Sequence, residues 1–62
     1  METTYLNIKT SHGVETWEEV NESDFPTFRE YKQEIRNLLE NYSQMGYSLY
    51  RSSRSTKAWK ES

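Results

Sequence analysis

The stretch from residue 28 to residue 45 constrains the fold of this chain more than any other. Its apolar side chains recur at intervals of three and four residues, which is typical of one side of an α-helix. At about 100° per residue, they fall within an arc of roughly 120°. They are Phe28, Tyr31, Ile35, Leu38, Leu39, Tyr42 and Met45. Such a stripe has to be buried, and a sheet formed by the rest of the chain is the only available partner.

The N-terminal end of this helix has two readings. Thr27 followed by Glu30 fits a capping box, in which the threonine hydroxyl accepts from the backbone N–H of residue 30 and the glutamate reaches back. Alternatively, Ser23 or Asp24 is the cap and Pro26 lies in the first turn. Both readings predict a helix that runs to about Met45.

The C-terminal end is marked by a glycine. Gly46 suits the left-handed position just after a helix, and Tyr47 follows it to pack back on the helix. Residues 47–52 then read as a third strand. Beyond it, Thr56–Lys60 reads either as a fourth strand with Trp59 packed inward or as part of a frayed polar tail that starts at about Ser52.

Two strands are expected before the helix. Residues Thr3–Thr10 alternate, with Leu6 and Ile8 on one face. Ser11, His12 and Gly13 form the turn, because glycine adopts the positive φ of a tight hairpin.

The second strand, Val14–Val20, does not reveal which of its faces is buried. Strict alternation places Val14, Thr16, Glu18 and Val20 on one face and Glu15, Trp17 and Glu19 on the other. We expect Trp17 to cover one edge of the core.

The order of elements predicts a single small α+β domain over residues 1–62. One amphipathic helix packs on one face of an antiparallel sheet of three to four strands, in the order β-β-α-β, or β-β-α-β-β with the extra strand. Leu, Ile, Val and Phe number ten of 62 residues, so the core is small.

Composition excludes several classes of protein. Without cysteine the chain has no disulfide and no thiolate zinc site. No apolar run approaches the roughly 20 residues of a membrane span, and residues 1–4 lack the basic and apolar regions of a signal peptide. We therefore expect a cytoplasmic protein with no membrane contact.

No arrangement of residues predicts catalysis. His12, the single histidine, falls in an exposed turn and has no partner nucleophile in the pattern. The carboxylates around Trp17 lie on both strand faces, without the glycine-bearing loop of an oxygen-ligated cation site. The expectation is a chain that is not an enzyme and has no catalytic residue, metal or cofactor.

Charge is unevenly distributed along the chain. Residues 1–31 hold seven acidic and two basic side chains (−5), and residues 32–62 hold three acidic and six basic ones (+3), which together give the net charge of −2. This asymmetry predicts two oppositely charged surfaces.

The acidic half provides the leading candidate site. Trp17 stands among Glu15, Glu18, Glu19, Glu22 and Asp24. Tryptophan is favoured as an interface anchor, and complementary charge speeds association. The prediction is a protein-binding surface on this hairpin.

The basic half provides the alternative, which is binding to nucleic acid. Positive charges interleave with aromatic rings there, as in single-strand binders. The candidate residues are Arg51, Arg54, Lys57, Lys60 and Tyr50, with Arg29, Lys32 and Arg36 as a second row on the helix. A homodimer formed through a strand edge or the outer aromatic side chains is a third hypothesis.

The element order, small size and lack of catalytic groups look broadly similar to phage-encoded proteins that bind and inhibit host enzymes. The similarity lies in the fold alone, and no residue role follows from it. It implies a regulator or inhibitor of a host protein, encoded by a phage or mobile element.

Overall fold

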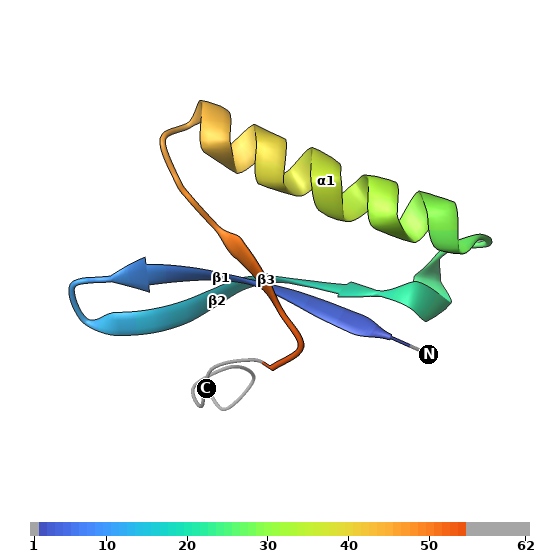
Figure 1. Ribbon diagram of the computed structural model, residues 1–62, viewed down its shortest axis with the longest axis horizontal. Coiled ribbons are helices and arrows are strands. Elements are labelled where there is room, and N and C mark those ends of the chain that lie inside the picture. The colour runs from blue at the N-terminus through green and yellow to red at the C-terminus, as the bar shows by residue number, and fades with distance from the viewer. Residues whose placement is uncertain (1, 55–62) are drawn as a thin grey trace.

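The computed structural model describes residues 2–54. It forms a three-stranded antiparallel sheet with one helix, which confirms the predicted α+β class and the β-β-α-β order. The elements are β1 (Thr3–Thr10), β2 (Gly13–Asn21), a short 3-10 turn η1 (Glu22–Asp24), α1 (Phe28–Gln44) and β3 (Tyr50–Ser52). The sheet order is β2-β1-β3, so β1 is central and α1 lies over one face (Figure 1).

The core lies between α1 and the sheet. Leu6, Val20, Tyr31 and Ile35 are buried. Four half-buried side chains pack against them: Phe25, Leu38, Leu39 and Leu49. The hydroxyl of Tyr31 is hydrogen-bonded to that of Thr4, which satisfies the polar end of this large core residue.

Both ends of α1 have the predicted caps. The Thr27 hydroxyl accepts from the Glu30 backbone N–H at 3.2 Å, whereas the alternative start at Ser23 or Asp24 is wrong because these residues form η1. At the other end Met45 is the C-cap and Gly46 has φ +93°. Within residues 2–54, no helix is long and apolar enough to cross a membrane.

A β-bulge interrupts the pairing of β1 with β2. Leu6 pairs with Glu18 and Asn7 pairs with Thr16, so Trp17 is the extra residue. Paired residues share a face, and therefore Glu18 lies on the helix side with Leu6, whereas Thr16 lies on the outer side with Asn7. The strict alternation predicted for this strand is wrong for that reason, because Trp17 and Glu18 both face α1.

The third strand is shorter than predicted. Only Tyr50–Ser52 pair with β1, opposite residues 5–7, while residues 47–49 carry the chain from the end of α1 down to the sheet (Figure 1). Conversely, β2 extends one residue beyond each predicted end. The suggested fourth strand at Thr56–Lys60, with Trp59, lies outside the described residues.

Candidate protein-binding surface

Three aromatic rings meet at the C-terminal end of α1. The ring of Trp17 contacts Tyr42 edge-on with a centroid distance of 5.7 Å, and it contacts Tyr47 with a centroid distance of 5.0 Å. These side chains come from β2, the last turn of the helix and the segment after it. Trp17 is half-buried, as predicted for a side chain that covers an edge of the core.

Backbone geometry holds all three rings in place. The bulge turns Trp17 toward the helix. The Tyr47 N–H donates to the Tyr42 carbonyl at 2.9 Å and the Gly46 N–H to the Ser43 carbonyl at 3.0 Å, which together form a Schellman motif. Tyr42 and Tyr47 are thereby brought to the same side of the helix end.

Two carboxylates border the rings. The Trp17 indole N–H donates to Glu15 Oε1 at 3.2 Å, and the Tyr42 hydroxyl donates to Glu18 Oε2 at 2.5 Å. The hydrogen bond to Glu18 raises the pKa of Tyr42, with partial burial and the negative charge of that carboxylate as smaller causes.

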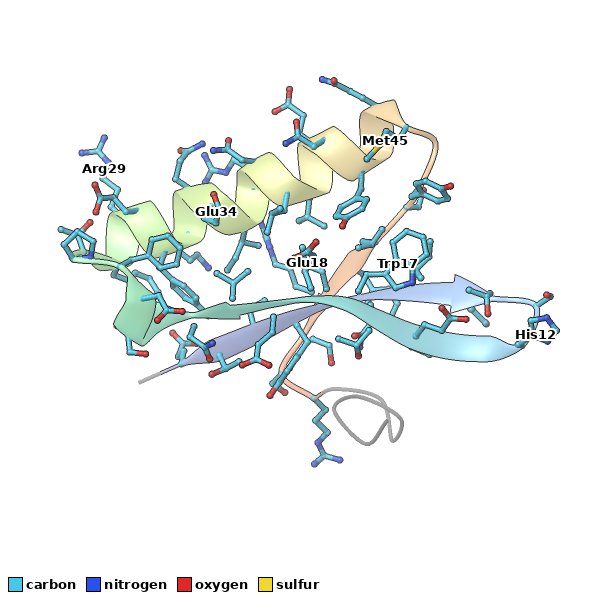
Figure 2. All side chains as sticks on the ribbon, turned by 180° about the vertical axis from the view of Figure 1, so that it is seen from behind. His12, Trp17, Glu18, Arg29, Glu34 and Met45 are labelled. Atoms are coloured by element: carbon cyan, nitrogen blue, oxygen red, sulfur yellow. The ribbon has the colours of Figure 1, made fainter. Side chains whose placement is uncertain are left out.

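Exposed apolar surface lies beside this cluster. Met45 is 62% exposed at the C-terminal end of α1, on the helix side of the sheet where Trp17 lies (Figure 2), and Tyr47 is 44% exposed. We call this surface the Trp17 face. It consists of Glu15, Trp17, Glu18, Tyr42, Met45 and Tyr47.

The structure does not bring all six predicted acidic-hairpin residues together. Glu15, Trp17 and Glu18 lie on the Trp17 face. Glu19 pairs with Tyr5 on the outer face of the sheet, where it accepts from the side chain of Asn21. Glu22 and Asp24 lie in η1, beyond the end of β2 that is remote from the hairpin turn, and Glu22 accepts from the backbone N–H of residue 2.

The basic residues of the alternative are also divided between surfaces. Arg51 pairs with Leu6 and faces the helix side, whereas Tyr50 pairs with Asn7 and faces the outer side. The Arg54 carbonyl accepts from Asn7, again on the outer side. Lys57 and Lys60 lie outside the described residues.

The second row of positive charge lies on the exposed surface of α1. It consists of Arg29, Lys32 and Arg36, and the Lys32 ammonium lies 5.7 Å from the centre of the Phe28 ring. Within residues 2–54, the predicted basic residues thus lie on different surfaces. Arg51 lies on the opposite side of β3 from Tyr50, and the three basic residues of α1 lie on the exposed surface of the helix.

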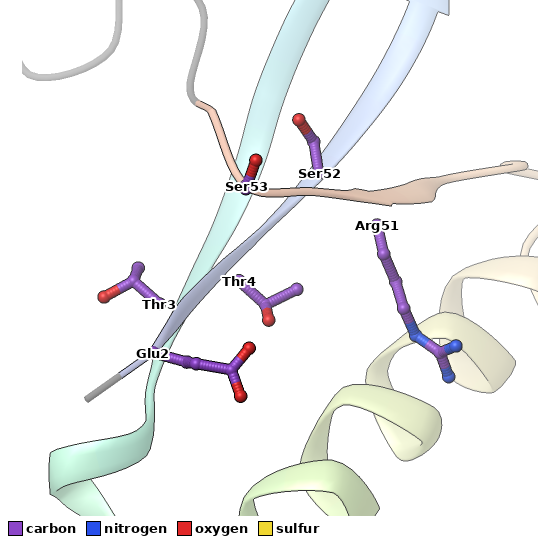
Figure 3. A pocket seen from close by; sticks show the side chains of 6 residues that line it. All are labelled: Glu2, Thr3, Thr4, Arg51, Ser52 and Ser53. Carbon is purple, nitrogen blue, oxygen red and sulfur yellow. The ribbon is translucent and has the colours of Figure 1, made fainter.

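A polar hollow of about 200 Å³ lies beside β1 and β3 (Figure 3). It is lined by Glu2, Thr3, Thr4, Arg51, Ser52 and Ser53. Three of its hydroxyls already hold structural hydrogen bonds: Thr3 to Asn21, Thr4 with Tyr31, and Ser52 to the Arg54 backbone. No histidine or lysine stands among the lining residues to activate a hydroxyl.

His12 is exposed at the hairpin turn, where its backbone N–H donates to the Thr10 hydroxyl. Among residues 2–54, no group of three or more His, Asp or Glu side chains is arranged to hold a metal ion.

Three members of the Trp17 face were not predicted as part of a site: Tyr42, Met45 and Tyr47. Tyr42 and Met45 were expected in the buried stripe of the helix, and Tyr47 was expected to pack back on the helix and begin a strand. The return of Tyr47 beside the last turn of α1 is confirmed by the Schellman motif. The meeting of these residues with Trp17 depends on the bulge in β2, which no local pattern marks.

Comparison of the chain with protein-family models, curated proteins and solved structures finds no match.

Proposed function

We propose that this chain is a non-catalytic protein-binding module that docks on its partner through the Trp17 face. The observation that carries the proposal is the partly exposed aromatic cluster of Trp17, Tyr42 and Tyr47, together with the exposed Met45 at the C-terminal end of α1. In a chain with few apolar residues, several of the largest ones lie at this surface.

The chemistry of the face suits an interface. Tryptophan, tyrosine and methionine are enriched in the centres of protein interfaces. Here the rings of Trp17 and Tyr42 are held by contacts and hydrogen bonds within the domain, so binding would cost little side-chain entropy. Glu15 and Glu18 form a charged border that favours an oppositely charged partner.

The finer form of the proposal is a regulator or inhibitor of a host protein, encoded by a phage or mobile element and acting in the cytoplasm. It is supported by the small size and the β-β-α-β order.

The test is affinity capture from a lysate of the cognate cell, with matched variants and quantitative mass spectrometry. We expect one protein to be captured by the natural chain and lost with Met45→Arg or with Tyr47→Ser. Val14→Arg is the control, because Val14 is also an exposed apolar residue (42% exposed) but lies on the outer face. Nuclease treatment should leave the capture intact.

Two outcomes would overturn the proposal. Capture that survives both Trp17-face variants would exclude this face. Capture that disappears with nuclease would instead favour the basic residues and nucleic acid.

A further inference from the structure

We propose that the partner presents a basic segment to the Trp17 face, with an arginine side chain lying against the exposed aromatic surface and pairing with Glu15 and Glu18. This inference rests on the proposed function and adds the chemistry of the partner. The reasons are the unused carboxylate oxygens, the aromatic rings beside them and the sign of the local charge.

Each carboxylate uses one oxygen inside the domain. Glu15 Oε1 accepts from the indole of Trp17, and Glu18 Oε2 accepts from the hydroxyl of Tyr42. Neither second oxygen has a hydrogen bond to another residue in the range 2–54. The internal bonds orient both carboxylates, and each keeps an oxygen for an external donor, which suits the several N–H groups of a guanidinium.

The aromatic rings favour a cation over a neutral group. A guanidinium is attracted to the face of tryptophan or tyrosine, and the attraction increases when carboxylates lie close by. Trp17 and Tyr47 meet edge-on, at an interplanar angle of 65°, so both rings are held in a fixed relative orientation. The 44% exposure of Tyr47 leaves part of its surface open to a partner.

Local charge selects the occupant. Among residues 2–54, the Trp17 face contains two carboxylates and no basic side chain. Lys9 pairs with Val14 on the outer face, and Arg51 shares the helix side with Glu18 but lies across β1 from it, opposite Leu6. A second copy that docked through the same face would oppose carboxylate to carboxylate, and a phosphate backbone would be repelled in the same way. A basic segment of another protein has neither problem.

The experiment is a fluorescence titration of the whole chain carrying Trp59→Phe, so that Trp17 is its only indole. The probe is a short unstructured Gly/Ser peptide with several arginines, and the matched probe has glutamates in their place. We expect the arginine peptide to change the Trp17 emission at low salt and the glutamate peptide to leave it unchanged. Added salt should weaken the binding.

Charge-removing variants locate the binding. Glu15→Gln with Glu18→Gln keeps one acceptor oxygen in each side chain for the internal hydrogen bonds, removes the charge, and should weaken binding of the arginine peptide roughly tenfold. Glu34→Gln with Glu40→Gln removes the same charge from α1 and should change the affinity much less. Equal weakening in the two double variants, or no response to the arginine peptide, would overturn the inference.

Failure of this inference is distinguishable from failure of the proposed function. If capture still depends on Met45 and Tyr47 while the arginine peptide does not bind, the face is an interface and its partner is not basic. Sedimentation across a concentration range tests the competing occupant. This is a second copy of the chain, which would present Arg29, Lys32 and Arg36 to the Trp17 face. If the chain associates with itself and the double variant Glu15→Gln with Glu18→Gln abolishes this association, the occupant of the Trp17 face is a second copy and the inference of a foreign basic partner is wrong.

Discussion

Glu18 links the sheet to the last turns of the helix through the hydroxyl of Tyr42. Because Glu18 and Trp17 are neighbours on one face, the same residue also sets the negative charge beside the aromatic cluster. A single side chain thus contributes both to the packing of α1 and to the proposed binding surface. These two roles can be separated by the substitution to glutamine, which keeps the acceptor and removes the charge.

At this scale we predict that Glu18→Gln lowers the pKa of Tyr42 toward its ordinary value of 10.0. The folded state holds the phenolic proton more tightly than the unfolded chain. The contribution of this contact to the free energy of unfolding is therefore full below about pH 10, and it is lost as pH rises through the raised pKa. Site-resolved NMR titration of the Tyr42 ring carbon measures the shift. Glu15→Gln is the control, and an unchanged Tyr42 pKa in Glu18→Gln would contradict the assignment.

Among the elements, α1 was predictable from the sequence and the bulge in β2 was not. Thr27, the apolar stripe and Gly46 are local signals, each read within a few residues, and the structure follows them. The bulge depends on pairing with β1, because Leu6 and Val20 must both face the helix while Thr16 meets Asn7 on the other side. No residue in β2 marks that choice, so a uniform alternation was the natural expectation.

We predict that deleting Trp17 removes the bulge without changing the fold. Thr16 and Glu18 become neighbours opposite Asn7 and Leu6, which restores regular alternation with Thr16 outside and Glu18 on the helix side. Amide spectra should keep the signals of β1 and of the core around Leu6 and Ile35, with lower stability because the packing on Tyr42 is lost. Trp17→Ala, which keeps the extra residue, is the matched comparison. If the deletion variant loses the dispersed amide signals of a folded protein while Trp17→Ala keeps them, the bulge itself is needed for folding and the prediction is wrong.

Across the described part of the molecule, charged residues are distributed by faces of the sheet rather than by halves of the chain. The acidic residues of the hairpin are divided among the Trp17 face, the outer face and η1. Arg51 and Tyr50, although adjacent in sequence, lie on opposite sides of β3. The prediction from sequence grouped residues that are close along the chain. In a strand, however, successive side chains point to opposite faces, and only the bulge places two neighbours, Trp17 and Glu18, on the same face.

The small core makes stability a sensitive reporter of binding. In the described part of the chain, the buried apolar side chains are Leu6, Val20, Tyr31 and Ile35, and domains of this size have only marginal stability. A ligand that binds only the folded state adds about 2.7 kcal/mol when its concentration is 100 times its Kd. For a small domain this raises the Tm by about 10–20 °C. We predict such a rise in Tm with the arginine peptide. Thermal unfolding monitored by circular dichroism measures it, because an unstructured peptide contributes little helical signal.

Measuring Tm in the two double glutamine variants also separates recognition by the folded surface from general attraction between charges. An unfolded chain keeps all its carboxylates but loses the arrangement of Trp17, Glu15 and Glu18. Attraction by net charge alone therefore stabilises both states, and the Tm stays constant even where the Trp17 emission responds to the peptide. A rise in Tm that shrinks in Glu15→Gln with Glu18→Gln, and persists in Glu34→Gln with Glu40→Gln, requires the folded Trp17 face itself.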